Sequence, residues 1–269
     1  MLPVTSIPPA RQGFHVIAKP TGALCNLACS YCFYTEKEGL YPGTESWAMP
    51  DSVLESFVRQ YLAAQDIPTV SFSWQGGEPT LLGIEFFKKV VALQRRYANG
   101  KRIENAFQTN GVLLDDRWGE FLATNGFLVG LSIDGPEELH DRYRVDRGGH
   151  PTFRSVMRGL EVLRRHGAEF NTLTVITHAN ADHPVDVYRF LLEHGSRYLQ
   201  FIPVVERSRQ PGPHGEANLA DPGSPGGEEI VTPWSVAPGQ FGGFLCGVFD
   251  EWVRHDVGQV FVQMFDAAL

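Results

Sequence analysis

Short strand-like segments and amphipathic helix-like segments alternate along most of this 269-residue chain. Strands separated by helices form a parallel sheet, because each helix returns the chain to the end of the sheet at which the previous strand began. The sequence therefore predicts an α/β fold, either a partial (β/α)6 barrel of the TIM type, open at one side, or a flat doubly wound sheet. Strands are predicted at 14–18, 69–74, 103–108, 127–133, 171–177 and 198–202, and helices at 50–64, 83–98, 115–125, 152–166 and 184–194.

The remainder of the chain divides by composition. Residues 206–235 are rich in Gly and Pro and show no apolar periodicity, which is typical of a long loop or linker. A helix is predicted at 238–255 and a strand at 259–265. The predicted organisation is a core at 12–205, a loop at 206–235, and a helix and strand at 236–269.

The charge balance excludes some classes of partner. The chain has 23 Lys and Arg against 31 Asp and Glu, a net charge of −8, whereas nucleic-acid-binding domains carry a basic stripe. We find neither an apolar run of about 18 residues nor a signal peptide. We therefore expect a cytoplasmic protein with no nucleic-acid partner and no membrane segment.

Three of the four cysteines, Cys25, Cys29 and Cys32, lie within eight residues of one another. Three thiolates are one fewer than a closed zinc or iron–sulfur site needs, so a [4Fe-4S] cluster held by them keeps one iron open to a small molecule. A zinc site completed by a histidine such as His15 is the alternative. Cys246 lies on the apolar stripe of the last helix, where we expect it to be buried; a role as fourth ligand is the other possibility.

Unusual polar peptides follow the predicted strands. In parallel α/β folds the site lies at the carboxyl ends of the strands, so these peptides define one polar rim. They are residues 75–79, 108–111, 132–135, 177–180 and 201–204.

The rim residues can be assigned to ligand groups, beside an open iron that can chelate the amino and carboxylate groups of an amino acid. The backbone of Gly76-Gly77 can approach a ligand closely, since no Cβ intervenes, and Glu78 can accept a hydrogen bond from an ammonium group. Ser132 and Asp134 can hold ribose hydroxyls. Arg144 can make a two-pronged contact with a carboxylate.

Each of these features also has a structural interpretation. The glycine pairs and the Asp134 turn are ordinary turn chemistry, and Arg144 could pair with Asp141 one helical turn away. The aromatics Tyr31, Phe33 and Tyr34 could belong to the core.

The combined motifs resemble a known family. C-x3-C-x2-C followed by an aromatic, with GGEP one strand later, resembles the radical S-adenosylmethionine (SAM) superfamily. The longer strings CNLACSYCFY, SFSWQGGEPTLLG, FQTNG, LSIDGP, the region around HDRYR, and LQFIPVVE resemble anaerobic sulfatase-maturating enzymes. The match runs from about Phe14 to the end of the chain, interrupted by the Gly/Pro-rich loop.

The resemblance implies a partial (β/α)6 barrel, a [4Fe-4S] cluster on the three clustered cysteines, and SAM as co-substrate. It implies that a 5′-deoxyadenosyl radical oxidises a cysteine or serine of a sulfatase to Cα-formylglycine, with a flavodoxin or ferredoxin as electron donor. The residues that it places against SAM are Tyr31, Gly76, Gly77, Ser132 and Arg144, with Val205 at the adenine; those that it places at the target peptide are Tyr34 and Gln75.

The chain departs from the family in one respect. Family members continue into a cysteine-rich domain with two auxiliary clusters and the proposed catalytic base, whereas this sequence ends at Leu269. We therefore expect a fragment or a truncated gene product, and we assign no catalytic base. The alternatives are a maturase that forms crosslinks or thioethers in another peptide, a cluster-binding fragment without turnover, and an electron-carrier or zinc-binding module.

Overall fold

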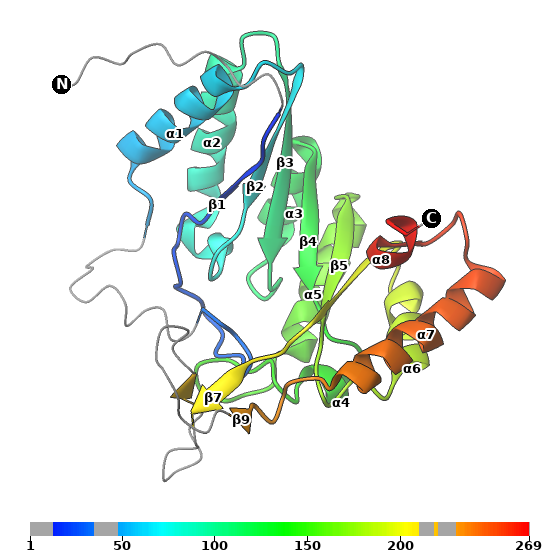
Figure 1. The fold of residues 1–269 in the computed structure, drawn as a ribbon. Helices are drawn as coiled ribbons and strands as arrows, with labels where there is room; N and C mark the ends of the chain where they lie inside the picture. Colours follow the sequence, from blue (N-terminus) through cyan, green and yellow to red (C-terminus); the bar gives the residue numbers. More distant parts are fainter. Residues whose placement is uncertain (1–12, 35–47, 210–217, 220–229, 269) are drawn as a thin grey trace. The chain divides into compact units, whose positions relative to one another are not determined.

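The computed structural model describes residues 13–34, 48–209, 218–219 and 230–268, and Figure 1 shows its helices and strands. The chain divides into two compact units, residues 1–26, 33–131 and 155–170 in the first, and residues 27–32, 132–154 and 171–269 in the second. Within the described ranges, none of the helices combines the length and the hydropathy that a membrane span requires.

The first unit contains four parallel strands in the order β1-β2-β3-β4. Each pair is parallel, as the predicted βα alternation requires. The strands are β1 (Val16–Ala18), β2 (Thr69–Trp74), β3 (Arg102–Thr109) and β4 (Phe127–Ser132). The helical segments are α1 (Asp51–Ala64), the 3₁₀ turn η2 (Pro79–Leu82), α2 (Gly83–Tyr97), α3 (Asp116–Thr124) and most of α5 (Phe153–His166).

The core of this unit is aromatic. Val70, Phe72 and Trp74 alternate with half-buried residues along β2, so all three point to the same, fully covered face of the sheet. The ring of Phe87 on α2 lies edge-on to Trp74, with centroids 6.0 Å apart. The indole N–H of Trp74 donates to Oδ1 of Asn105 at 2.9 Å, so its polar atom is satisfied inside the apolar layer.

The second unit contains the parallel strands β5 (Phe170–Ile176), β6 (Tyr198–Pro203) and β10 (Phe261–Val262), in that order. A small antiparallel sheet, β8-β7-β9, comprises β7 (Arg207–Arg209), β8 (Asn218–Leu219) and β9 (Ile230–Val231). The helices are α4 (Glu137–His140), α6 (Pro184–Glu193), α7 (Pro238–His255) and α8 (Gln263–Asp266).

Glycines end two of the predicted helices. Gly126 and Gly167 follow α3 and α5 with φ of 61° and 66°, a left-handed conformation that residues with a Cβ adopt reluctantly. The turns that they form return the chain to β4 and β5. The carboxyl ends of those strands then present the peptides that the sequence singled out.

The loop or linker predicted at 206–235 lies largely outside the described residues, and its described parts include β7, β8 and β9. Two other expectations about the C-terminal part were wrong. The strand predicted at 259–265 is limited to Phe261–Val262, and the helical turn α8 follows it. Cys246 is exposed, because α7 buries Phe244 and Val248 and the residue midway between them points away from that face.

Candidate active site

The glycine pair after β2 lies against the segment that leads to the first cysteine of the motif. The amide of Gly77 donates to the carbonyl of Gly22 at 2.8 Å, and the amide of Glu78 donates to that of Leu24 at 2.8 Å. A Cβ on Gly77 would lie 2.0 Å from the Leu24 oxygen, and one on Gly76 would lie 2.9 Å from the Gly22 oxygen. The absence of a Cβ at Gly76 and Gly77 therefore permits this turn to pack closely against the backbone of residues 22–24.

Glu78 joins the ends of β2 and β3. Its carboxylate is fully buried and accepts from the amide and hydroxyl of Thr80, from the hydroxyl of Thr109 at 2.8 Å, and from the amide of Asn110 at 2.7 Å. Burial raises the pKa of Glu78 above its ordinary value, and these hydrogen bonds oppose the rise. These four hydrogen bonds from the chain indicate that the Glu78 carboxylate has a structural role at the ends of β2 and β3.

Asn110 connects Glu78 to the first cysteine. Its side-chain amide donates to Oδ1 of Asn26 at 2.8 Å and lies 3.7 Å from the sulfur of Cys25. The Cys25 sulfur lies at the same distance, 3.7 Å, from the Asn26 oxygen. The sequence marked Asn110 only as a turn residue, and its position directly after β3 was the one signal of a further role.

The two residues expected at the target peptide lie near the end of β1. The amide of Gln75 donates to the carbonyl of Ala18 at 2.9 Å, and the side chain is half-buried. The ring of Tyr34 is buried and has the ammonium group of Lys19 5.0 Å from its centroid. Thr21, in the next turn, is buried, and no described group hydrogen-bonds its hydroxyl.

Cys29 and Cys32 lie on one turn of the second unit, in which the amide of Cys32 donates to the carbonyl of Cys29 at 3.0 Å. The segment is fixed by Ser30, whose amide donates to the carbonyl of Tyr143 at 3.0 Å. Burial raises the pKa of the Cys29 thiol to about 11, although the nearby Arg144 cation acts to lower it. A metal that binds this sulfur must therefore displace a proton.

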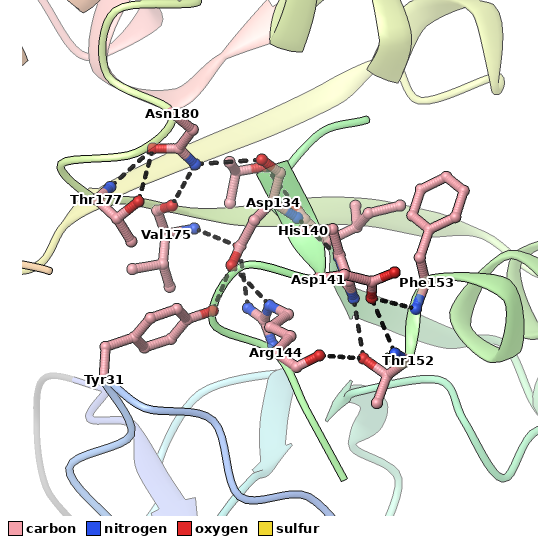
Figure 2. Close-up of polar contacts among 12 residues, drawn as sticks. Tyr31, Asp134, His140, Asp141, Arg144, Thr152, Phe153, Val175, Thr177 and Asn180 are labelled. Carbon is pink, nitrogen blue, oxygen red and sulfur yellow. Dashed lines mark hydrogen bonds and ion pairs between the residues drawn. The ribbon is translucent and has the colours of Figure 1, made fainter. Parts of the chain in front are cut away.

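Asp134 is the centre of the polar network in this unit (Figure 2). Its two carboxylate oxygens accept four hydrogen bonds: from the hydroxyl of Tyr31, from Nε and Nη2 of Arg144 at 2.8 and 3.1 Å, and from the amide of Val175 at 3.0 Å. Its carbonyl accepts from the side-chain amide of Asn180 at 3.2 Å. Arg144 thus forms its ion pair with Asp134, which corrects the alternative that it pairs with Asp141. Both charged side chains of the pair are buried.

The electrostatics of this group keep each proton in place. Burial raises the pKa of Tyr31 well above its ordinary value, so the hydroxyl remains a donor to Asp134. Burial, the largest single cause, acts to lower the pKa of Arg144, but the charge and hydrogen bonds of Asp134 together with Tyr31 and Cys29 outweigh it, and the net direction is upward. The buried pair is therefore a carboxylate and a guanidinium cation with complementary hydrogen bonds.

The structure brings the predicted residues together in two groups, each within one unit. Gly76, Gly77 and Glu78 lie with Cys25 in the first, and Tyr31 lies with Asp134 and Arg144 in the second. Ser132 ends β4 and is half-buried, whereas Val205 lies two residues beyond β6 with an exposed fraction of 63%. Among the described residues, no three His, Cys, Asp or Glu side chains form a metal-binding group.

The second group has three further members that were not predicted as site residues, namely His140, Thr152 and Asn180 (Figure 2). Asn180 lies in one of the polar peptides after a strand, which was a usable signal. His140 and Thr152 lie on the loop between β4 and α5, where single buried polar residues leave no pattern in a sequence.

Comparison with known proteins gives a consistent result. Residues 20–191 match the Radical SAM superfamily. The chain is 46% identical over 267 residues to a serine-type anaerobic sulfatase-maturating enzyme of Bacteroides thetaiotaomicron, covering 98% of this chain and 63% of that protein. It is 38% identical to a cysteine-type anaerobic sulfatase-maturating enzyme of Clostridium perfringens, covering 94% of this chain and 65% of that protein.

The fold agrees with a solved structure, described as native anSMEcpe with bound AdoMet and Cp18Cys peptide. The TM-score is 0.77 at 36% identity, and the alignment covers 94% of this chain and 64% of that one. This confirms the predicted α/β fold, and an open partial barrel is consistent with it. The chain spans slightly less than two thirds of the length of these relatives.

Proposed function

The chain belongs to the radical SAM superfamily, and on that premise we propose that it holds one [4Fe-4S] cluster and uses SAM to oxidise a serine or cysteine of a sulfatase to Cα-formylglycine. The observation that carries the proposal is the 46% identity to a serine-type anaerobic sulfatase-maturating enzyme over 98% of the chain. The family itself uses a [4Fe-4S] cluster and SAM.

Thiolates are the ligands that such a cluster takes, and the cysteine motif supplies three of them. None of Cys25, Cys29 and Cys32 is in a disulfide, and Cys29 and Cys32 share one hydrogen-bonded turn. Three thiolates are one fewer than the cluster has irons, so one iron is left for the amino and carboxylate groups of SAM. When bound, the cluster and SAM supply the hydrogen-atom abstraction that starts oxidation of the target side chain.

The side chains of the second unit are proposed to orient SAM. Arg144 is proposed to take the carboxylate of SAM, because its cation is fixed by a two-pronged contact with Asp134. Tyr31 and Ser132 are assigned to SAM by their place in the motifs, and Val205, which is exposed, is assigned to the adenine.

Two residues have geometries that favour a supporting role. The carboxylate of Asp134 accepts four hydrogen bonds from the chain, so we assign it to positioning Arg144 and Tyr31. Glu78 likewise accepts four, and the Gly76-Gly77 turn beside it lies against the chain. A direct contact of Glu78, Gly76 or Gly77 with SAM remains a prediction.

The target peptide is proposed to meet Tyr34 and Gln75 near the end of β1. Oxidation of serine to the aldehyde removes two electrons and two protons in total. Reductive cleavage of one SAM to methionine and 5′-deoxyadenosine would take up both electrons and one of the protons. The electron that reduces the cluster at the start must come from a donor, and we propose a flavodoxin or ferredoxin. Cysteines that form no disulfide suit a reducing compartment such as the cytoplasm, which we propose as the location.

The test is aldehyde formation in a peptide. The anaerobically reconstituted chain is incubated with SAM, a reductant and a peptide that contains the C-x-P-x-R motif of sulfatases, and a hydrazine traps any aldehyde. A second peptide has serine in place of the cysteine, and a control peptide has alanine there. Trapped aldehyde in either of the first two, and none in the third, is the expected result.

Two outcomes would redirect the proposal. If 5′-deoxyadenosine forms but no peptide yields an aldehyde, the chain cleaves SAM without oxidising a sulfatase peptide. If another peptide acquires a thioether or carbon–carbon crosslink instead, the substrate class is wrong and the family assignment stands.

A further inference from the structure

The loop from β4 to α5 is closed by a buried histidine. The ring of His140 is fully buried on α4, and its Nδ1 lies 3.3 Å from the amide nitrogen of Asp134. Its Nε2 lies 3.2 Å from Oγ1 of Thr152, at the beginning of α5 (Figure 2). The histidine thus joins Asp134, the second residue after β4, to Thr152, the residue before α5.

The donor and acceptor in each of these hydrogen bonds follow from the first contact, between Asp134 and His140. The Asp134 amide can only donate, so Nδ1 of His140 accepts, and a neutral ring then carries its proton on Nε2. That proton is donated to Oγ1 of Thr152. The Thr152 hydroxyl proton is left for the carbonyl of Arg144, which lies 2.8 Å away.

The surroundings keep the ring neutral. Burial is the main cause, and the Arg144 cation the second, of a His140 pKa lowered to about 3. Protonation of Nδ1 would also remove the acceptor of the Asp134 amide. Because the ring is buried and both of its nitrogens are hydrogen-bonded within the chain, it serves as a fixed connector.

Arg144 is consequently held at both ends. Its guanidinium rests on the carboxylate of Asp134, and its carbonyl accepts from Thr152. Thr152 is fixed in turn, since Oδ1 of Asp141 accepts from its amide at 2.9 Å and from that of Phe153 at 2.8 Å. Residues 134–153, which we call the frame, therefore hold Arg144 by hydrogen bonds at both its side chain and its main chain.

We propose that His140 and Thr152 are positioning residues, which hold the main chain of Arg144 so that its guanidinium can meet the carboxylate of an amino-acid ligand. The inference rests on the proposed function, in which that ligand is SAM. It differs from a purely structural role, which predicts loss of stability without loss of affinity in the folded protein.

The decisive variants change one hydroxyl. Thr152→Val keeps the volume and removes the link, and Thr152→Ser restores the hydroxyl. Thr172→Val is the matched control, because Thr172 is similarly buried in the same unit and its Oγ1 hydrogen-bonds Ser196 at 2.8 Å, apart from the frame. SAM affinity is measured by calorimetry under nitrogen on reconstituted protein, with iron content and folded fraction determined for each sample.

The expected result is that Thr152→Val weakens SAM binding about tenfold, that Thr152→Ser recovers most of it, and that Thr172→Val binds like wild type. Equal affinities of wild type and a folded, iron-loaded Thr152→Val would overturn the inference. Should Thr152→Val not fold, His140→Asn cuts the same link from the other side while an acceptor for the Asp134 amide remains. If both single variants fold, the variant that combines them should bind SAM no more weakly than the single variant with the lower affinity. Additive losses of binding free energy would contradict a shared link.

A second readout needs no SAM. Nitrogen-15 chemical shifts of the histidines, with His140 identified by its absence in His140→Asn, should show a proton on Nε2 and none on Nδ1 from pH 5 to 8. A proton on Nδ1 would overturn the inference directly. Failure of wild type to bind SAM would instead refute the proposed function, so the two failures are distinguishable.

Discussion

Arg144 meets both carboxylate oxygens of Asp134, with Nε 2.8 Å from Oδ2 and Nη2 3.1 Å from Oδ1. The two side chains are only 7% and 2% exposed. Removal of one partner from such a pair leaves the other charge buried without compensation, whereas a pair at the surface contributes little. The pair thus makes the second unit sensitive to a single atom of Asp134.

We predict that Asp134→Asn lowers the free energy of unfolding by about 3–5 kcal/mol, because it leaves the Arg144 cation unpaired. Urea denaturation monitored by circular dichroism measures this. Glu104→Gln, which breaks the exposed Arg102–Glu104 pair, is the control and should change stability by less than about 1 kcal/mol. Similar losses in the two variants would show that the buried pair has no special weight.

The buried His140 predicts a pH dependence of stability. Its pKa is lowered from 6.5 to about 3 on folding, so the unfolded chain binds more protons between these values. Stability should therefore fall as pH falls through this window, by up to about 1.4 kcal/mol per pH unit from this group. Denaturation of wild type and His140→Asn at several pH values isolates the contribution: the two curves should converge as pH falls. Parallel curves would mean that His140 is not buried in neutral form.

Gly77 should tolerate no side chain. The Cβ of Gly77→Ala would lie 2.0 Å from the Leu24 carbonyl oxygen, and backbone must shift to admit it. We expect a loss of at least about 1–3 kcal/mol and weaker iron retention, since Leu24 directly precedes Cys25. The control is Gly243→Ala on α7, where nothing lies within 4 Å of the new Cβ. That change should instead stabilise by about 0.5–1 kcal/mol, and effects of the same sign would contradict the packing argument.

Replacement of Glu78 by glutamine should destabilise the protein. Glu78→Gln substitutes a donor for an acceptor among four donors, so we expect a loss of about 1–3 kcal/mol in thermal or urea unfolding. Glu161→Gln, on the surface of α5, provides the comparison. Equal stabilities of the two variants would exclude a structural role for the Glu78 carboxylate.

Local patterns predicted the helices and strands of the core closely. Period and glycine stops located α3, β4, α5 and β5 to within one or two residues, because these signals act within a few residues of chain. α4 has four residues, too few to establish a period. Likewise, β10 has only two residues, and its parallel pairing with β6 depends on the tertiary fold.

The candidate site was predictable by residue type and less so by partner. Asp134 and Arg144 were both singled out for a ligand or a turn, but their pairing was not predicted, because the sequence does not show that the chain returns Arg144 to Asp134, ten residues before it. Gly77 was expected to face a ligand and lies against Leu24. His140 escaped notice because its partners, Asp134 and Thr152, are brought to it only by the closed loop.

The proposed cluster rests on three sulfurs. Alanine at Cys25, Cys29 or Cys32 should abolish iron retention and SAM cleavage, while Cys246→Ala, at an exposed position on α7, should leave both intact. Iron loss in Cys246→Ala would make that residue a ligand, and full SAM cleavage by any of the other three variants would disprove its assignment.

Iron and sulfide analysis of the anaerobically reconstituted chain, combined with electron paramagnetic resonance before and after addition of SAM, tests the central claim most directly. We predict about four iron and four sulfide per chain, and a spectrum of the reduced cluster that shifts when SAM binds its open iron. A protein that stays iron-free, or a cluster whose spectrum ignores SAM, would contradict the account.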